Sequence, residues 1–127
     1  MTLLDASFPI AEAAERTGLS THTLRYYERE GLMLGVVDRA SSSHRRYIEA
    51  DIVWVTFLTK LRSTGMPIAK VREYVDLVRA GDDSMPARLE LLLAHRETVL
   101  MQLDEINHSL AAIDFKIATY QKGSHGS

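Results

Sequence analysis

Residues 19–31 read LSTHTLRYYEREG, a short polar stretch that carries the start and stop signals of a helix. Ser20 is a favourable N-cap, because its hydroxyl can accept a hydrogen bond from a backbone N–H of the first turn. Gly31 can end the helix in the left-handed conformation that glycine tolerates. Leu24 would face inward, with Tyr27 as its neighbour three positions on. The outward side chains would be Thr21, His22, Arg25, Tyr26 and Arg29. We interpret this stretch as a DNA-recognition helix, although a helix of this composition taken alone is more often a solvated amphipathic helix.

The preceding segment favours the DNA-binding interpretation. Residues 8–18 have the pattern of a short helix with small residues at Ala13 and Ala14, which allow close helix packing, and with Gly18 as its end. Two short helices joined by a glycine-containing turn make a helix-turn-helix. Leu24 could pack back against Ile10. Taken alone, the pattern also fits any small helical hairpin.

After Gly31 the helical pattern stops, and residues 32–47 predict a two-stranded hairpin. A β-prone pair at residues 36–37 is followed by a serine-rich turn at 41–43 and a basic returning strand. A hairpin in this place would be the wing of a winged helix-turn-helix. Arg39, Arg45 and Arg46 are candidates for phosphate contacts, which hold a protein on DNA without reading its sequence. We expect Tyr47 to pack against the domain.

Two further helices are predicted at residues 49–64 and 68–80, ending at Gly65 and Gly81. Their apolar residues recur at helical spacing and indicate a hydrophobic core. The large aromatic side chains of this region are expected to serve packing rather than ligand binding. They are Trp54, Phe57 and Tyr74.

The remainder of the chain predicts one long helix with a heptad seam. The seam positions are Met85, Leu89, Leu92, Arg96, Val99, Leu103, Ile106, Leu110, Ile113, Ile117 and Tyr120. At 1.5 Å per residue the seam is about 50 Å long, and a helix cannot bury such a stripe on itself. A second copy of the chain is the simplest partner, which predicts a symmetric homodimer. Arg96 either sets the register of the pair or lies where the seam meets the partner's globular part.

The sequence is therefore expected to be mainly α, with three parts. Residues 8–81 would form a winged helix-turn-helix DNA-binding domain with two supporting helices. Residues 85–121 would form a dimerisation helix, and residues 122–127 a disordered tail of linker composition. The dimer contacts would come from Leu89, Leu92, Val99, Leu103, Ile106, Leu110, Ile113 and Ile117.

Composition excludes several classes of site. The chain of 127 residues has no cysteine, which excludes disulfides, thiolate metal sites and thiol-based sensing within it. The net charge of −2 is unusual for a DNA-binding protein, but five arginines stand between Ser20 and Tyr47. His95 and His108 are too far apart to form a local ligand pair, so no metal and no cofactor is expected. The chain has no apolar run long enough to span a membrane and no secretion signal, which predicts a cytoplasmic protein without a membrane partner.

Several motifs together resemble the MerR family of bacterial transcription regulators. They are the Leu24-Arg25-Tyr26-Tyr27-Glu28 run behind a short helix, Gly31-Leu32, the Arg45-Arg46-Tyr47 end of the wing, the Leu61-Arg62-Ser63-Thr64-Gly65-Met66-Pro67-Ile68 junction and the C-terminal heptad helix. The resemblance covers residues 8–121. Its most specific part is the Leu-Arg-Tyr-Tyr-Glu run.

The resemblance implies a homodimer joined by an antiparallel coiled coil, which binds an inverted-repeat promoter and bends and untwists the spacer DNA so that RNA polymerase can initiate. By position, Thr21, His22 and Arg25 would enter the major groove, whereas Tyr26 and Tyr27 would contact the DNA backbone. Arg45 of the wing would grip phosphate, as could His44, which replaces an aromatic residue of the family. The junction motif is similar to that of aldehyde- and electrophile-responsive members, which often carry a cysteine where this chain has Lys60.

Two other functions compete with a transcription regulator. One is an architectural or excision-type DNA-bending protein that uses the same winged unit without an effector. The other is an enzyme, for which the sequence offers no nucleophile–base pair, phosphate-binding glycine loop or metal spacing. We expect no enzymatic activity. A small-molecule effector is left open, and it would have to bind among residues 66–74, the coiled coil and the partner.

Overall fold

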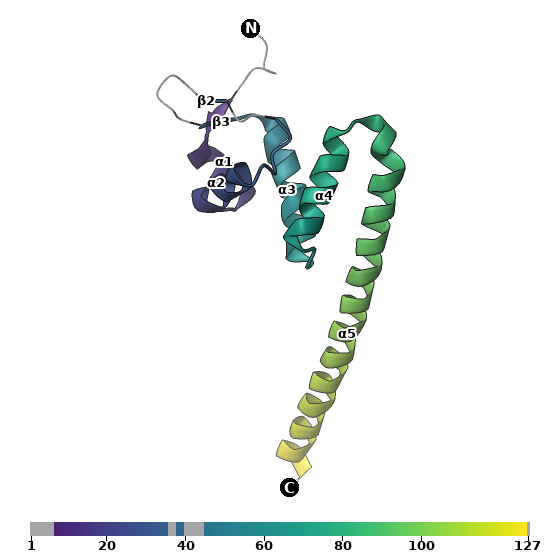
Figure 1. Cartoon of the computed structure of the whole chain (residues 1–127). Helices are drawn as coiled ribbons and strands as arrows, with labels where there is room; N and C mark the ends of the chain where they lie inside the picture. The colour runs from purple at the N-terminus through teal and green to yellow at the C-terminus, as the bar shows by residue number, and fades with distance from the viewer. Residues whose placement is uncertain (1–6, 36–37, 40–44, 127) are drawn as a thin grey trace. The chain divides into compact units, whose positions relative to one another are not determined.

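The computed structural model describes residues 7–35, 38–39 and 45–126. The chain divides into two compact units, Met1–Leu89 and Glu90–Ser127. In chain order the elements are β1 Phe8–Pro9, α1 Ile10–Thr17, α2 Thr21–Arg29, β2 Asp38–Arg39, β3 Arg45–Tyr47, α3 Glu49–Ser63, α4 Ile68–Arg79, the 3₁₀ turn η2 Asp82–Ser84 and α5 Met85–Gly126 (Figure 1). The mainly α fold is confirmed, with a winged helix-turn-helix first and a long helix last.

Helices α1 and α2 form the predicted helix-turn-helix. Gly18 ends α1 with a positive φ of 75°, and its N–H donates to Ala14 O at 2.9 Å. Helix α1 packs against both α2 and α3. Ala13 of α1 and Leu24 of α2 are both completely buried. Both helices therefore contribute to the core of the first unit.

The wing is part of a three-stranded antiparallel sheet, where the sequence predicted only two strands. The strand order is β1-β3-β2, and Phe8 lies opposite Tyr47 across β1 and β3. The sequence-based assignment of Phe8 and Pro9 to the first helix is therefore wrong. Pro9 adopts an extended conformation with ψ of 164° and serves as the N-cap of α1. Phe8 and Tyr47 are both buried, so apolar packing favours the added strand. The serine loop at 41–43 lies outside the described residues.

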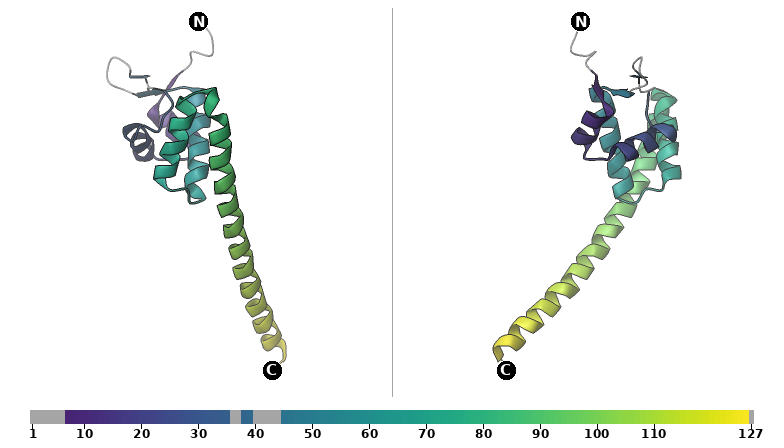
Figure 2. Two further views of the ribbon diagram at one scale, coloured as in Figure 1. Left: turned by 45° about the vertical axis from the view of Figure 1, so that its right-hand side comes forward. Right: turned by 90° about the vertical axis from the view of Figure 1, so that its left-hand side faces the viewer.

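Helices α3 and α4 lie side by side and form the core of the first unit (Figure 2). Its buried side chains from these helices are Val55, Leu58, Leu61, Val71 and Val75. The aromatic residues pack as predicted, since Trp54 is stacked on Tyr74 with ring centroids 5.9 Å apart. The ring of Phe57 is tilted against the ring of the same tyrosine, and the two ring centroids are 5.7 Å apart. These contacts hold α4 in a defined position against α3.

The start of α3 is capped by a carboxylate. Asp51 accepts a hydrogen bond of 2.9 Å from the N–H of Ile48, which would otherwise have no partner within the helix. Burial raises the pKa of Asp51 above its ordinary value, and the negative charge of Glu28 raises it further, whereas the bond from Ile48 lowers it. The recognition helix and the start of α3 thus bring two carboxylates near each other.

Helix α5 is continuous from Met85 to Gly126 (Figure 1). Most of its seam side chains are exposed in the single chain, for example Leu103 at 50% and Ile106 at 62%, whereas Leu92 and Val99 are half-buried. The helix continues through residues 122–126, where the sequence predicted a disordered tail. An existing helix adds one hydrogen bond for each further residue, which offsets the weak helix propensity of glycine and serine. None of the helices described is long and apolar enough to cross a membrane.

Candidate nucleic-acid interface

The recognition helix α2 is held by its apolar face and exposes its basic face. The Ser20 hydroxyl accepts a hydrogen bond of 3.0 Å from the N–H of Thr23, as an N-cap should. At the other end Gly31 has the positive φ of 72° that ends the helix. Leu24 and Tyr27 are buried. Because the opposite side of the helix faces solvent, His22, Arg25 and Arg29 are exposed.

Three predicted contact residues of α2 are less exposed. Thr21 and Tyr26 are half-buried, and Tyr26 lies between the Tyr27 ring and the Arg29 guanidinium, which is 6.0 Å from its centroid. Tyr27 is only 6% exposed. It stands one turn after Leu24 and therefore shares its inward face. The structure thus gives Tyr27 a packing role, and Tyr26 is the tyrosine at the edge of the exposed face.

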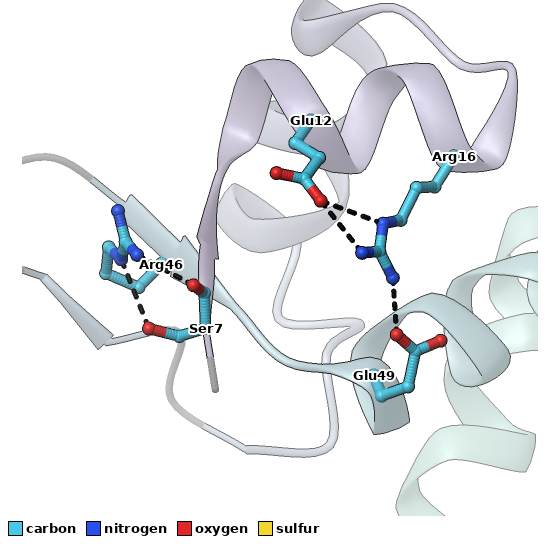
Figure 3. Close-up of polar contacts among 5 residues, drawn as sticks. All are labelled: Ser7, Glu12, Arg16, Arg46 and Glu49. Atoms are coloured by element: carbon cyan, nitrogen blue, oxygen red, sulfur yellow. Dashed lines mark hydrogen bonds and ion pairs between the residues drawn. The ribbon is translucent and has the colours of Figure 1, made fainter. Parts of the chain in front are cut away.

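The predicted contact residues of the wing are not all described in the same detail. Arg39 and Arg45 are paired in register across β2 and β3, and His44 lies outside the described residues. Arg46 is half-buried and donates to Ser7, with Nε at 3.2 Å from the hydroxyl and Nη2 at 2.8 Å from the carbonyl oxygen (Figure 3). Arg46 therefore ties β3 to the segment before β1. That contact occupies part of the guanidinium that the sequence assigned to phosphate.

Arg16 is a structural residue that the sequence did not single out. Its guanidinium bridges two carboxylates, Glu12 on the same helix at 2.8 Å and Glu49 at the start of α3 (Figure 3). It also lies 4.2 Å from the centroid of the Phe8 ring. The hydrogen bond that Arg16 donates to Glu12 raises the pKa of Arg16, desolvation lowers it, and the bond and negative charge of Glu49 raise it further. The Glu12–Arg16 spacing of four was visible in the sequence, but the contact with Glu49 depends on the tertiary fold.

One buried contact joins the wing to the recognition helix. The hydroxyl of Tyr47, on β3, donates to the carboxylate of Glu28, on α2. The Tyr47 side chain is completely buried, and the hydrogen bond itself is partly shielded from water. It connects the two elements that carry the predicted DNA contacts.

We expect Tyr47→Phe to destabilise the domain by about 1.5–3 kcal/mol, the usual size of a hydrogen bond to a charged group. The substitution removes only the hydroxyl that donates to Glu28. The midpoint of urea unfolding at constant protein concentration measures the loss. Tyr74→Phe is the matched control, because the Tyr74 hydroxyl makes no hydrogen bond among the described residues, and it should leave the midpoint nearly unchanged. Equal midpoints for both variants would contradict a stabilising Tyr47–Glu28 bond.

Metal-binding side chains form no cluster among the described residues. In residues 7–35, 38–39 and 45–126, no three His, Asp or Glu side chains gather in a set that could hold a metal ion. The exposed donors and cations of α2 stand on a helix that is joined to strand β3 through the Tyr47–Glu28 bond. A short exposed helix behind a turn, next to a small basic sheet, is the arrangement of a winged helix-turn-helix DNA-binding protein.

Comparison with known families agrees with this class. The profile of the MerR HTH family regulatory proteins matches residues 8–77, which contain the helix-turn-helix, the wing and nearly all of the two supporting helices. The match covers more than half of the chain. The chain therefore belongs to the MerR family, and it is a MerR-type transcription regulator.

Individual relatives are similar over most of their length. A Haemophilus influenzae protein described as an uncharacterized HTH-type transcriptional regulator is 34% identical over 116 residues, which cover 91% of this chain and 85% of the relative. The HTH-type transcriptional regulator AdhR of Bacillus subtilis is 40% identical over 91 residues, or 72% of this chain and 64% of the relative. The crystal structure of HiNmlR, a MerR family regulator lacking the sensor domain and bound to promoter DNA, superposes with a TM-score of 0.87. It is 32% identical, with 94% of this chain and 90% of that chain covered.

Proposed function

We propose that this regulator acts as a homodimer whose two recognition helices read the two halves of an inverted-repeat promoter. The observation that carries the proposal is the face of α2, where Leu24 and Tyr27 are buried and Arg25 is exposed beside His22 and Arg29. A rigidly held helix that presents donors and cations can enter a major groove. The promoter-bound state named for HiNmlR supports promoter DNA as the ligand of this chain as well.

The contacts fall into two kinds. Thr21, His22 and Arg25 would read base edges, for which the arginine guanidinium is suited because it can donate two hydrogen bonds to one guanine. The positioning contacts to phosphate would come from Tyr26, Tyr27, Arg39, His44, Arg45 and Arg46. Tyr27 is only 6% exposed, so its contact would be limited to that small part of the side chain. Phosphate contacts hold the register of the protein on the DNA, so the wing would fix where α2 reads.

The exposed seam of α5 supports the homodimer. Apolar side chains about half exposed at regular heptad spacing, such as Leu103 and Ile106, are unfavourable in water and gain burial when two helices pair. We infer an antiparallel coiled coil over residues 85–121, with residues 8–81 as the DNA-binding part. The seam residues would be Leu89, Leu92, Val99, Leu103, Ile106, Leu110, Ile113 and Ile117.

Regulation would act on the DNA between the two half-sites. Bending a promoter spacer by several tens of degrees costs of order 1–6 kcal/mol, so a dimer that grips phosphate on both sides can trap a deformed state. RNA polymerase would respond to the changed alignment of its promoter elements. The protein would act in the cytoplasm, as a regulator and without catalysis. The regulatory names of its relatives favour this function over an architectural one.

Selection from random double-stranded DNA tests the proposal directly. The full chain should enrich an inverted repeat, footprint both halves of it, and alter transcription by a bacterial RNA polymerase from a promoter that contains it. Bent DNA should be detected by energy transfer between dyes at the two ends of the site. Enrichment of no sequence, or of a single half-site bound by a monomer, would count against the proposal. Bending without any effect on transcription would favour the architectural alternative.

A further inference from the structure

The turn that follows the recognition helix is held by side chains of two other helices. Arg79 of α4 donates through Nη2 to Gly31 O at 2.8 Å and also to Met33 O. Trp54 of α3 donates through Nε1 to Leu32 O at 2.8 Å. Three consecutive carbonyls after α2 thus accept hydrogen bonds from outside the turn. These carbonyls lie beyond α2, whose own last carbonyls accept from the backbone N–H groups of residues 30–32, so the three bonds hold the turn that follows the helix.

A second arginine of α4 holds the residue that caps the end of α2. Arg72 pairs through Nη2 with the carboxylate of Glu30, which is the C-cap of α2. The Nε of Arg72 is buried and has no hydrogen-bond partner among the described residues. The guanidinium is therefore partly removed from water, and Glu30 is the carboxylate that neutralises it. In this respect the pair differs from the more exposed Lys70–Glu73 pair on the same helix.

The two arginines act on α2 from one face of α4. They are seven residues apart, which is two helical turns, and so they lie one above the other. Both bring positive charge to the C-terminal end of α2, where the helix dipole favours a cation. We call Arg72, Arg79, Glu30 and the carbonyls of Gly31 and Met33 the α2–α4 clamp.

The clamp supplies polar contacts that restrict the direction of α2 more strongly than apolar packing does. Leu24 and Tyr27 already bury the inner face of α2, but apolar contacts depend on area and are weakly directional. Hydrogen bonds and ion pairs require a defined distance and angle. Helix α2 packs against α1, and the clamp adds a second, directional link from α2 to α4, which itself packs against α3.

We propose that Arg72 and Arg79 are positioning residues for DNA recognition, which set the direction of α2 relative to α4 and with it the half-site separation that the dimer accepts. The inference rests on the proposed function, because it needs two recognition helices on one site. Each base pair added between half-sites rotates one of them by about 34° around the DNA axis. A recognition helix that is held in a fixed direction should bind such a site weakly, whereas a helix that is held less firmly can adjust to it and bind.

The test uses the full chain and the inverted repeat that it selects, together with two versions of this DNA whose centre is one base pair shorter or longer. Wild-type protein should bind the altered spacings about 10–100-fold more weakly than the selected one, the cost of one or two lost base contacts. Arg79→Gln should weaken binding to the selected spacing and reduce the difference between spacings to about 3-fold or less. Binding is measured by fluorescence anisotropy at constant salt, since phosphate contacts make affinity depend on salt.

Arg62→Gln is the matched control. It removes the same charge and a hydrogen bond of 2.7 Å from an arginine to a backbone carbonyl, that of Met66, but touches no part of α2. We expect it to change all three affinities by the same factor and to keep the spacing preference. A clamp variant that lowers all three affinities equally has only lost stability or charge, and this result would overturn the inference.

A charge exchange keeps the test valid if a single variant folds poorly. Arg72→Glu and Glu30→Arg should each flatten the spacing preference, and the double variant should restore it, because the ion pair is re-formed with its partners exchanged. A double variant that folds but stays flat would refute the role of the pair. If wild-type protein selects no inverted repeat at all, the proposed function fails, whereas a selected repeat with unchanged preferences in every clamp variant refutes the inference alone.

Discussion

Arg25→Ala is expected to weaken sequence-specific DNA binding severely while the protein stays folded. The side chain is exposed on α2 and contributes nothing to the core. A bidentate arginine–guanine contact is worth about 1–3 kcal/mol of discrimination, and a symmetric dimer loses it twice. The affinity for the selected repeat should therefore fall by a factor between about 30 and 10⁴. Anisotropy titrations at constant moderate salt measure the change, and circular dichroism verifies the fold.

Lys116→Ala provides the control for this prediction. Lys116 is an exposed cation on α5 whose ammonium lies 5.9 Å from the ring of Tyr120. Its removal alters the net charge by the same amount but leaves α2 untouched. It should change affinity only slightly, because a single exposed charge outside the recognition helix is screened by salt. Unchanged binding by Arg25→Ala would show that α2 does not read the bases.

Leu103→Asp is expected to convert the dimer into monomers or unfolded chains. Leu103 is a seam residue, 50% exposed in the single chain, and pairing would bury it against the second copy. Shortening a buried leucine costs about 2–5 kcal/mol, and a carboxylate in the seam adds its desolvation. The two copies double the effect. Sedimentation equilibrium should detect the loss of the dimer, and binding to the inverted repeat should fall with it, because the two half-sites are then bound independently.

Ala112→Asp is the matched substitution away from the seam. It introduces the same charge into the same helix, and alanine to aspartate carries a helix-propensity cost of its own. The variant should remain a dimer with a slightly lower melting temperature. A stable dimer in Leu103→Asp at the same protein concentration would contradict the coiled-coil proposal. Ile106→Asp gives an independent check at the next seam position, which is 62% exposed in the single chain.

Local periodicity predicted the helices of this protein well. The Ser20 cap and the Gly31 end delimit α2 as expected, and the inward Leu24 and outward Arg25 follow from a period of 3.6 residues. Strand β1 was missed because two residues are too short to show an alternating pattern. Phe8 is recruited into the sheet only because Tyr47 lies opposite.

The polar contacts that orient the candidate site could not be predicted in the same way. Arg16 and Glu49 are 33 residues apart, Tyr47 and Glu28 are 19 apart, and Arg72 and Glu30 are 42 apart. No local spacing signals these pairs, since each depends on how two elements pack. Arg46 illustrates the limit, because the sequence assigned it to phosphate and the fold engages it with Ser7.

The sequence by itself determined the class of this protein: a short basic recognition helix behind a glycine turn, an arginine-bearing strand, and a long helix with an apolar seam. These features are local, because caps, helical periods and heptads act between residues a few positions apart. Only the tertiary structure decided which side chains hold the recognition helix in place. Glu30, Arg72 and Arg79 meet because α2 and α4 are brought together by the burial of apolar residues elsewhere in the chain, and hydrogen bonding then selects one direction among the packings that burial alone allows.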